Sequence, residues 1–332
     1  MESINITQVI NNIAEVVEKH RLGPGCYKRF LQDDFPNPYG CADAANILYT
    51  IGRFPREHAE RDAFVQNIRK MQDEETGLFI EKPSLPGKFI HDPIHTTAHC
   101  MAALELFDEA PLYRAKSLEQ YLEHDKMCQF FDSFDWSGTP GTPAHKGAGL
   151  FAALNLGGSD CIEFNKNYFK WLWENSDHNT GLLRAGCQDG KISIWHHMAT
   201  TFHFLFNLEY AHIPLRYPEK LIDSCIYMYR EEPMENFGKN AKFVEMDWVY
   251  CLTRALQQTA HRYNEVIDVL EEFAEEYITH WLTVDYENDI NINDMHELFG
   301  GVCALAELQR ALRGKLYSDV PLKLVLDRRP FI

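Results

Sequence analysis

Two kinds of apolar segment alternate along the chain. In the first kind, apolar residues recur at helical spacing among many charged residues, the pattern of a helix that buries one face. These segments occupy 4–20, 57–72, 112–127, 161–175, 216–230 and 264–282. The second kind is crowded with Ala, Gly, Cys and Thr, and its members occupy 41–52, 96–107, 145–158, 199–209, 247–258 and 297–309. The alternation predicts twelve helices of two types.

The small-residue segments repeat along the chain. Their landmark leucines recur about every 50 residues, at Leu48, Leu104, Leu154, Leu208, Leu256 and Leu305. Thr76–Glu105 also aligns without a gap on Thr180–Glu209, sharing a Thr-Gly-Leu start and a later Thr-Thr-x-His. Six small-residue helices around an axis, covered by six amphipathic ones, are what a closed ring of hairpins requires. We predict an all-α (α/α)6 toroid, one domain over 1–332 with a short tail at 316–332. An open solenoid of hairpins is the alternative.

The two aligned repeats also resemble a known group of proteins. The segments QDEETGLF…TTAHCMAALEL and ENSDHNTGLL…ATTFHFLFNLE resemble the repeats of the terpenoid cyclase and protein prenyltransferase toroids. The resemblance implies a toroid, a fold shared with many carbohydrate-active hydrolases, lyases and epimerases, and the fold alone does not choose a reaction. The Asp-x-Asp-Asp acid motif of terpenoid cyclases is absent from the sequence.

Loop lengths predict where a site would lie. The connections from outer to inner helices are long, at 73–91, 128–142, 176–194, 231–243 and 283–293, whereas the return connections are short. Long loops on a rigid scaffold commonly carry binding residues, so we expect the mouth at the N-terminal ends of the inner helices.

Helical arithmetic predicts which side chains face the axis. At 100° per residue His95 and His99 lie about 40° apart, and Leu104 lies opposite His95. The positions equivalent to His95 in the six inner helices are Tyr39, His95, His145, Ala199, Asp247 and His296. One turn deeper lie Asp43, His99, Gly149, His203, Cys251 and Gly300. A stripe of polar groups on apolar helices is costly unless the groups are solvated or paired, so we expect an acidic, histidine-rich pocket.

Candidate roles follow from this placement. We expect the catalytic groups to be Asp43, Asp92, His95, His197, Asp247 and His296. We expect the substrate-binding residues to be Tyr39, Trp136, His145, Lys146, Trp195, His196, Glu245, Trp248 and Glu297. Structural alternatives stay open: His99 and His203 as repeated hydrogen-bonding histidines, and Asp43 and Asp92 as helix caps or first-turn carboxylates.

A metal is a further alternative. Asp247, Cys251 and His296 follow the chain order of the zinc ligands in protein prenyltransferases, so the resemblance implies zinc there. The Cys follows the Asp by four residues instead of two, one turn deeper. The pair His95 and His99, four residues apart on one face, could also hold a metal. We therefore predict no cofactor, with zinc as the alternative.

Composition narrows the function class. The chain has 332 residues, with 32 Lys and Arg against 49 Asp and Glu, a net charge of −17. This balance argues against nucleic acid or an anionic membrane as the main partner. Nine scattered cysteines, no secretory signal pattern and no long apolar run predict a cytoplasmic protein.

The expected lining of carboxylates, histidines and aromatic residues at the mouth favours a hydrolase, lyase or epimerase acting on a sugar or uronate. The alternatives are an isoprenoid enzyme of the cyclase or prenyltransferase kind and a non-catalytic toroid that binds a small molecule or peptide.

Overall fold

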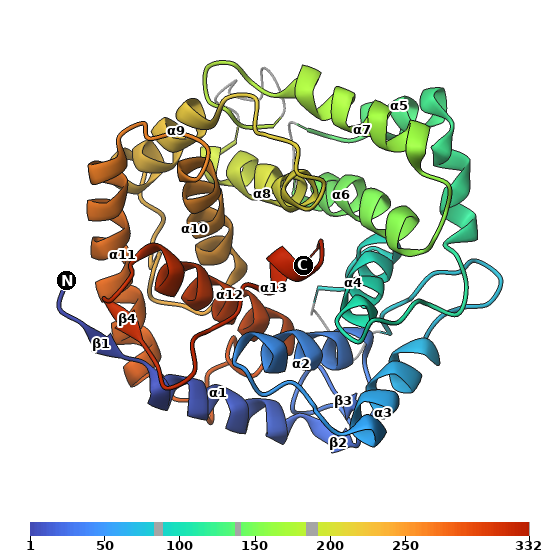
Figure 1. Cartoon of the computed structure of the whole chain (residues 1–332), viewed down its shortest axis with the longest axis horizontal. Coiled ribbons are helices and arrows are strands. Elements are labelled where there is room, and N and C mark those ends of the chain that lie inside the picture. Colours follow the sequence, from blue (N-terminus) through green and yellow to red (C-terminus); the bar gives the residue numbers. More distant parts are fainter. Residues whose placement is uncertain (83–88, 137–140, 184–191, 332) are drawn as a thin grey trace.

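The computed structural model describes residues 1–82, 89–136, 141–183 and 192–331, and this part of the chain is mostly helical. No helix among these residues is long and apolar enough to cross a membrane. The small-residue segments form the inner helices α2 (Pro38–Thr50), α4 (Pro93–Glu105), α6 (Gly141–Leu156), α8 (Ile194–Tyr210), α10 (Phe243–Leu256) and α12 (Met295–Ala311). Each inner helix packs on the next, and α12 returns to α2, so their contacts form a closed cycle (Figure 1).

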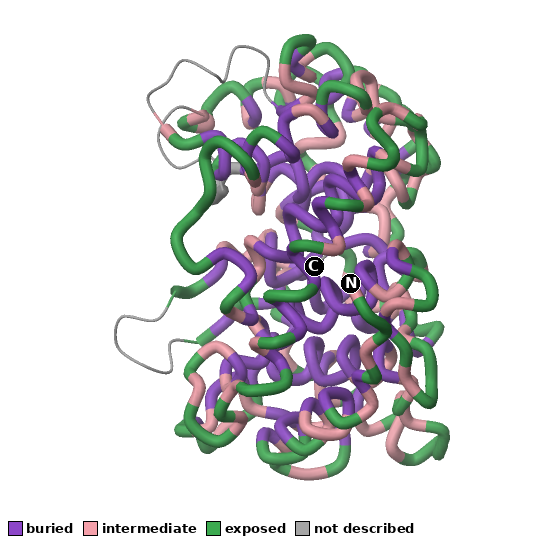
Figure 2. The backbone as a smooth tube through the Cα atoms, turned by 90° about the vertical axis from the view of Figure 1, so that its left-hand side faces the viewer, coloured by how far each residue is buried: buried purple, intermediate pink, exposed green. Residues whose placement is uncertain are grey.

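Small residues allow this close packing. Gly149 on α6 lies against the start of α4, where an added Cβ would come within 3.1 Å of the Ile94 carbonyl oxygen. A larger residue would push the two helices apart. Seen from the side, the buried stretches of the chain run through the middle of the molecule and the exposed stretches lie around them (Figure 2).

The charged amphipathic segments form the outer helices. These are α1 (Thr7–Lys19), α3 (His58–Arg69), α7 (Ile162–Asn175), α9 (Pro218–Glu231) and α11 (Tyr263–Thr283), with η1 (Lys116–Leu122) and α5 (His124–Asp132) between α4 and α6. Their apolar faces cover the inner helices, and Tyr277 on α11 donates its hydroxyl to the Gly301 carbonyl at 3.2 Å.

The third outer segment differs from the prediction. Instead of one helix over 112–127, the chain forms the 3₁₀ turn η1 and then α5, separated by Glu123 in an extended conformation. The reason is tertiary: the Ser117 N–H donates to the carbonyl of Thr76 at 3.1 Å, which holds the start of η1 against the preceding turn.

The internal repeat corresponds to a repeated hydrogen-bonded turn. Gly77 N donates to Asp73 O, and the backbone N–H of Phe79 donates to the hydroxyl of Thr97 at 2.8 Å. The copy 104 residues later has the same bonds, from Gly181 N to Asp177 O and from Leu183 N to the Thr201 hydroxyl. Both glycines have positive φ, +76° and +72°, which an L side chain rarely adopts. The matched Thr-Gly and Thr-Thr letters are therefore the parts of this turn and its anchor on the next inner helix.

The C-terminal segment fills the centre of the molecule. The small hairpin of β2 (Arg21–Gly23) and β3 (Cys26–Tyr27) lies apart from it, near α3. The C-terminal segment begins with β4 (Leu316–Tyr317), which pairs in parallel with β1 (Ile4–Asn5). After β4 the chain turns inward through α13 (Val325–Arg328), and its end lies between the inner helices in Figure 1. Arg329 and Phe331 are fully buried. The Phe331 ring lies 4.8 Å from the ring of His95, so the predicted short tail is part of the core.

Candidate active site

Six imidazole groups gather where the inner helices begin. They come from α4, α6, α8, α12 and the segment that precedes α4, namely His91, His95, His99, His145, His203 and His296. Neighbouring rings lie close together: the centroids of His91 and His95 are 4.8 Å apart, and those of His145 and His203 are 4.4 Å apart. The axis-facing register of the sequence therefore brings together Tyr39, His95, His145 and His296, with His99 and His203 one turn deeper.

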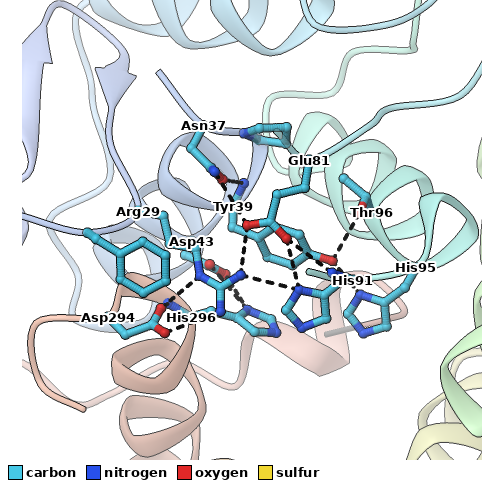
Figure 3. A network of polar contacts seen from close by, with 12 residues as sticks. Arg29, Asn37, Tyr39, Asp43, Glu81, His91, His95, Thr96, Asp294 and His296 are labelled. Carbon is cyan, nitrogen blue, oxygen red and sulfur yellow. Dashed lines mark hydrogen bonds and ion pairs between the residues drawn. The ribbon is translucent and has the colours of Figure 1, made fainter. Parts of the chain in front are cut away.

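Tyr39 holds these rings in place. It begins the first turn of α2, where Asn37 caps the helix by accepting the Tyr39 N–H at 2.8 Å. The Tyr39 ring is fully buried and stacks on His91 at 4.3 Å and on His99 at 5.1 Å. Its hydroxyl lies 2.6 Å from Nδ1 of His95 (Figure 3). The tyrosine is thus a structural centre of the cluster and is sealed from solvent.

A buried charged network lies beside the imidazoles (Figure 3). The Arg29 guanidinium donates to Glu81 at 2.7 Å and to both carboxylate oxygens of Asp294 at 2.9 and 3.2 Å. Nδ1 of His91 lies 3.2 Å from Glu81. Burial opposes the charge of Glu81, but its bonds to His91 and Arg29 lower the pKa of this carboxyl to about 2. The single arginine therefore neutralises two buried carboxylates that come from distant segments.

Only one member of this network has a pattern in the sequence. His91 could have been predicted, because His91, His95 and His99 are spaced by four residues, a spacing typical of one side of a helix. Arg29 and Glu81 have no such pattern, since both lie outside helices and are 52 residues apart in the sequence.

Asp43 joins two of the histidines. It is fully buried on α2, and its carboxyl oxygens lie 2.7 Å from Nε2 of His99 and 3.2 Å from Nδ1 of His296. Burial raises the pKa of Asp43 well above its usual range and lowers the pKa of His99 and His296 well below theirs. One nitrogen of each histidine and one oxygen of Asp43 lie within 4.8 Å of one another, so a metal could be held there.

A second group consists of histidines alone. One nitrogen each from His95, His145 and His203 lies within 4.8 Å of the others. His95 and His203 are buried, while His145 is half-buried. Burial, with the neighbouring imidazoles, lowers the pKa of His95 and His145 well below the usual range, and it lowers that of His203 to about 4. These rings are neutral near pH 7 and can offer nitrogen lone pairs.

Three carboxyl groups lie at the starts of α10 and α12. Glu245 accepts the Gly238 N–H at 3.2 Å, and Glu297 accepts that of Phe243 at 3.3 Å. Burial raises the pKa of Glu245 to about 8 and that of Glu297 to about 7, and it raises that of Asp247 well above its usual range. In the described part of the chain, one oxygen of Glu245 and one of Asp247 have no hydrogen-bond partner. Glu297, whose pKa lies near neutral pH, is the only half-buried member of the three; Glu245 and Asp247 are buried.

The zinc triad implied by the prenyltransferase resemblance does not fit this geometry. His296 turns its Nδ1 to Asp43, and neither Asp247 nor Cys251 belongs to a described group whose ligand atoms lie within 4.8 Å of one another. Cys251 is fully buried, and burial raises the pKa of its thiol well above the usual range, which disfavours the thiolate that binds zinc.

The three tryptophans expected as substrate walls lie in the layer between the inner and outer helices. Trp248 donates its indole N–H to the Cys225 carbonyl at 2.9 Å, and Trp195 donates to that of Glu232 at 2.7 Å. Trp136 packs among the aromatic rings of α5 and α7. Their polar tips are bonded to the backbone, and their rings fill the space between helices.

The remaining expected residues lie near the N-terminal ends of α4, α6 and α8. Asp92 caps α4 by accepting the Ile94 N–H at 2.9 Å and also pairs with Lys146 at 3.2 Å, so the capping alternative is seen in the structure. On α8 His196 is exposed, whereas its neighbour His197 is buried.

No family model, no curated protein and no solved structure matches this chain.

Proposed function

We propose that the chain is a single (α/α)6 toroid of the kind found in terpenoid cyclases, protein prenyltransferases and many carbohydrate-active enzymes. The closed cycle of contacts among α2, α4, α6, α8, α10 and α12 supports this architecture. The repeated turn with its glycine and its threonine anchor supports a toroid built by duplication of helical hairpins.

On this scaffold the proposed activity is that of a hydrolase, lyase or epimerase acting on a sugar or uronate at the mouth. The observation that carries the proposal is that a half-buried carboxyl group, Glu297, directly follows His296 of the imidazole group in the first turn of α12. Acid and base chemistry needs groups whose pKa lies near the working pH, and the pKa of Glu297 is about 7.

Glu297 is the proposed general acid. It lies in the first turn of α12, next to His296, and is accessible in part. Phe89 offers a flat surface for a sugar ring at the group of histidines, because the residue is 55% exposed and its ring lies 4.9 Å from that of His91. A substrate stacked there would lie over the imidazole groups.

The test is a turnover screen with neutral and uronate-containing oligosaccharides, read by mass spectrometry. We expect the wild type to give a product, and Glu297→Gln to lower the rate by roughly 10²- to 10⁴-fold with an unchanged circular dichroism spectrum. The control is Glu15→Gln, on the exposed side of α1. Full activity of Glu297→Gln would remove this residue from the reaction.

An isoprenoid substrate is the second candidate, because Phe89 and its neighbour Ile90 expose apolar surface at the same mouth, 55% and 44% of their side-chain area. Farnesyl diphosphate belongs in the same screen for this reason. Turnover of that compound together with none of any oligosaccharide would replace the sugar proposal. Thermal stabilisation by a panel member without product would point to the non-catalytic binding toroid.

A further inference from the structure

Three successive inner helices direct one histidine each to the same place. His95 on α4, His145 on α6 and His203 on α8 have ring centroids 4.6 Å apart for the first pair and 4.4 Å apart for the second. Their facing nitrogens all lie within 4.8 Å of one another. Tetrahedral zinc with its usual nitrogen distances needs ligand atoms about 3.3 Å apart, so modest side-chain rotations bring the three nitrogens to that spacing.

The hydrogen bond of His203 determines which of its nitrogens can bind a cation. Nδ1 of His203 lies 2.7 Å from the Ala199 carbonyl oxygen, which only accepts, so Nδ1 carries the proton. In a neutral ring Nε2 then holds a lone pair. A carbonyl that orients a histidine in this way is the usual outer partner of a metal ligand.

His95 is oriented by a chain of hydroxyl groups. The Thr96 hydroxyl donates to the Asp92 carbonyl at 3.3 Å, and the Tyr39 hydroxyl lies 3.3 Å from Thr96 and 2.6 Å from Nδ1 of His95. The chain is satisfied when Nδ1 of His95 donates to Tyr39, Tyr39 to Thr96, and Thr96 to the carbonyl. The proton is then on Nδ1, and the lone pair of His95 is on Nε2.

Lone pairs of buried rings that face one another repel unless a positive group lies between them. We propose that His95, His145 and His203 bind one divalent transition-metal ion, preferentially zinc. Neutral imidazole suits zinc, copper, iron and nickel and does not suit calcium or magnesium.

The site has the form of an open metal centre. Three protein ligands leave a fourth position for water or substrate, and His145 is the half-buried member of the three. The group of Asp43, His99 and His296 is a weaker candidate, because its own hydrogen bonds of 2.7 and 3.2 Å already satisfy the facing atoms. Metal binding at the three histidines goes beyond the proposed function and does not depend on the identity of the substrate.

The experiment measures metal content and the cobalt spectrum of the full chain. Purified protein is incubated with excess ZnCl₂ or CoCl₂, separated from free metal by gel filtration and analysed for bound metal. We expect one zinc per chain, and for the cobalt form the visible absorption of a tetrahedral nitrogen-bound ion. We expect His145→Ala and His203→Ala to lower the affinity at least 100-fold.

Two further variants distinguish a specific metal site from nonspecific binding of zinc to surface histidines. His212→Ala removes an exposed histidine just after α8, the helix that carries His203, and is expected to leave zinc binding unchanged. Tyr39→Phe keeps the ring but removes the acceptor of His95, and we expect a roughly 10- to 100-fold loss of zinc affinity, the effect typical of an outer partner.

Several outcomes would overturn the inference. They are less than stoichiometric zinc in folded wild-type protein, equal binding by His145→Ala and the wild type, and loss of zinc in His99→Ala with retention in His145→Ala. If a variant unfolds, as judged by circular dichroism, the cobalt spectrum of the wild type still decides whether nitrogen ligands hold the ion. Loss of the sugar activity alone would leave the metal result unaffected.

Discussion

Glu245→Gln is expected to stabilise the protein at neutral pH. Glu245 is 1% exposed, its Oε1 accepts the Gly238 N–H, and its Oε2 has no hydrogen-bond partner within the described ranges. Burial raises its pKa from the ordinary 4.5 to about 8, so the folded chain keeps a proton that the unfolded chain releases. The glutamine has the shape of the protonated acid and can accept the same N–H. The substitution therefore removes the free energy needed to protonate residue 245 on folding at neutral pH, and it keeps the packing of the side chain.

The magnitude follows from the two pKa values. Between pH 4.5 and 8 the unfolded state is ionised and the folded state is not, so the free energy of unfolding falls by about 1.4 kcal/mol per pH unit. At pH 7 this amounts to about 3 kcal/mol, and below pH 4.5 it vanishes. The stability lost by the wild type as the pH rises through this window is what Glu245→Gln should retain.

Urea unfolding at about pH 4.5, 6 and 7 measures this difference. We expect Glu245→Gln to match the wild type at the lowest pH and to exceed it increasingly at the higher values. Glu15→Gln on the exposed side of α1 is the control and should show no such divergence. A constant difference across the pH range, or a less stable variant at pH 7, would refute the assignment of a buried neutral Glu245.

Three other substitutions test the fold and the charged network. Arg29→Met leaves two buried carboxylates without their cation and is expected to cost about 3–5 kcal/mol in urea unfolding, whereas a loss under about 1 kcal/mol would mean that water replaces the guanidinium. Phe331→Ala removes a fully buried ring and should cost about 3 kcal/mol in the same assay, and an unchanged value would show that the tail does not belong to the core. Gly77→Ala places a Cβ 1.8 Å from a backbone oxygen at positive φ, so we expect its melting temperature to fall by several degrees. Gly23→Ala, with open space around it, should leave the melting temperature nearly unchanged, and equal effects of the two would contradict this reasoning.

Much of the fold is visible in the sequence because it is local. Periodicity and small-residue content determine where a helix forms and which face it buries. Each of the predicted segments at 4–20, 57–72, 161–175, 216–230 and 264–282 contains one outer helix, although the first begins with the short strand β1. The matched Thr-Gly and Thr-Thr pairs correspond to one hydrogen-bonded turn made twice. The segment 112–127 departs from its pattern because a contact with a distant turn, at Thr76, shapes it.

The sequence predicted the part of the site that depends on the periodicity of each single helix. The 100° rule places Tyr39, His95, His145 and His296 on the axis-facing side, and the structure brings their side chains together. The tryptophans were harder to place, because an aromatic residue at helical spacing can face either the pocket or the outer helices. Only the packing shows that the indole of Trp248 is bonded to α9.

What the sequence alone determined is the set of helices, their repeat and the polar face of each inner helix, since these depend on neighbours along the chain. The tertiary structure decided which side chains from distant segments contact one another. Arg29 meets Glu81 and Asp294 across 52 and 265 residues, and the tail brings Phe331 to His95. Such pairings leave no local pattern because they arise only when the elements pack together. The resulting burial and ion pairing shift the pKa of groups such as Glu81, Glu245 and His203.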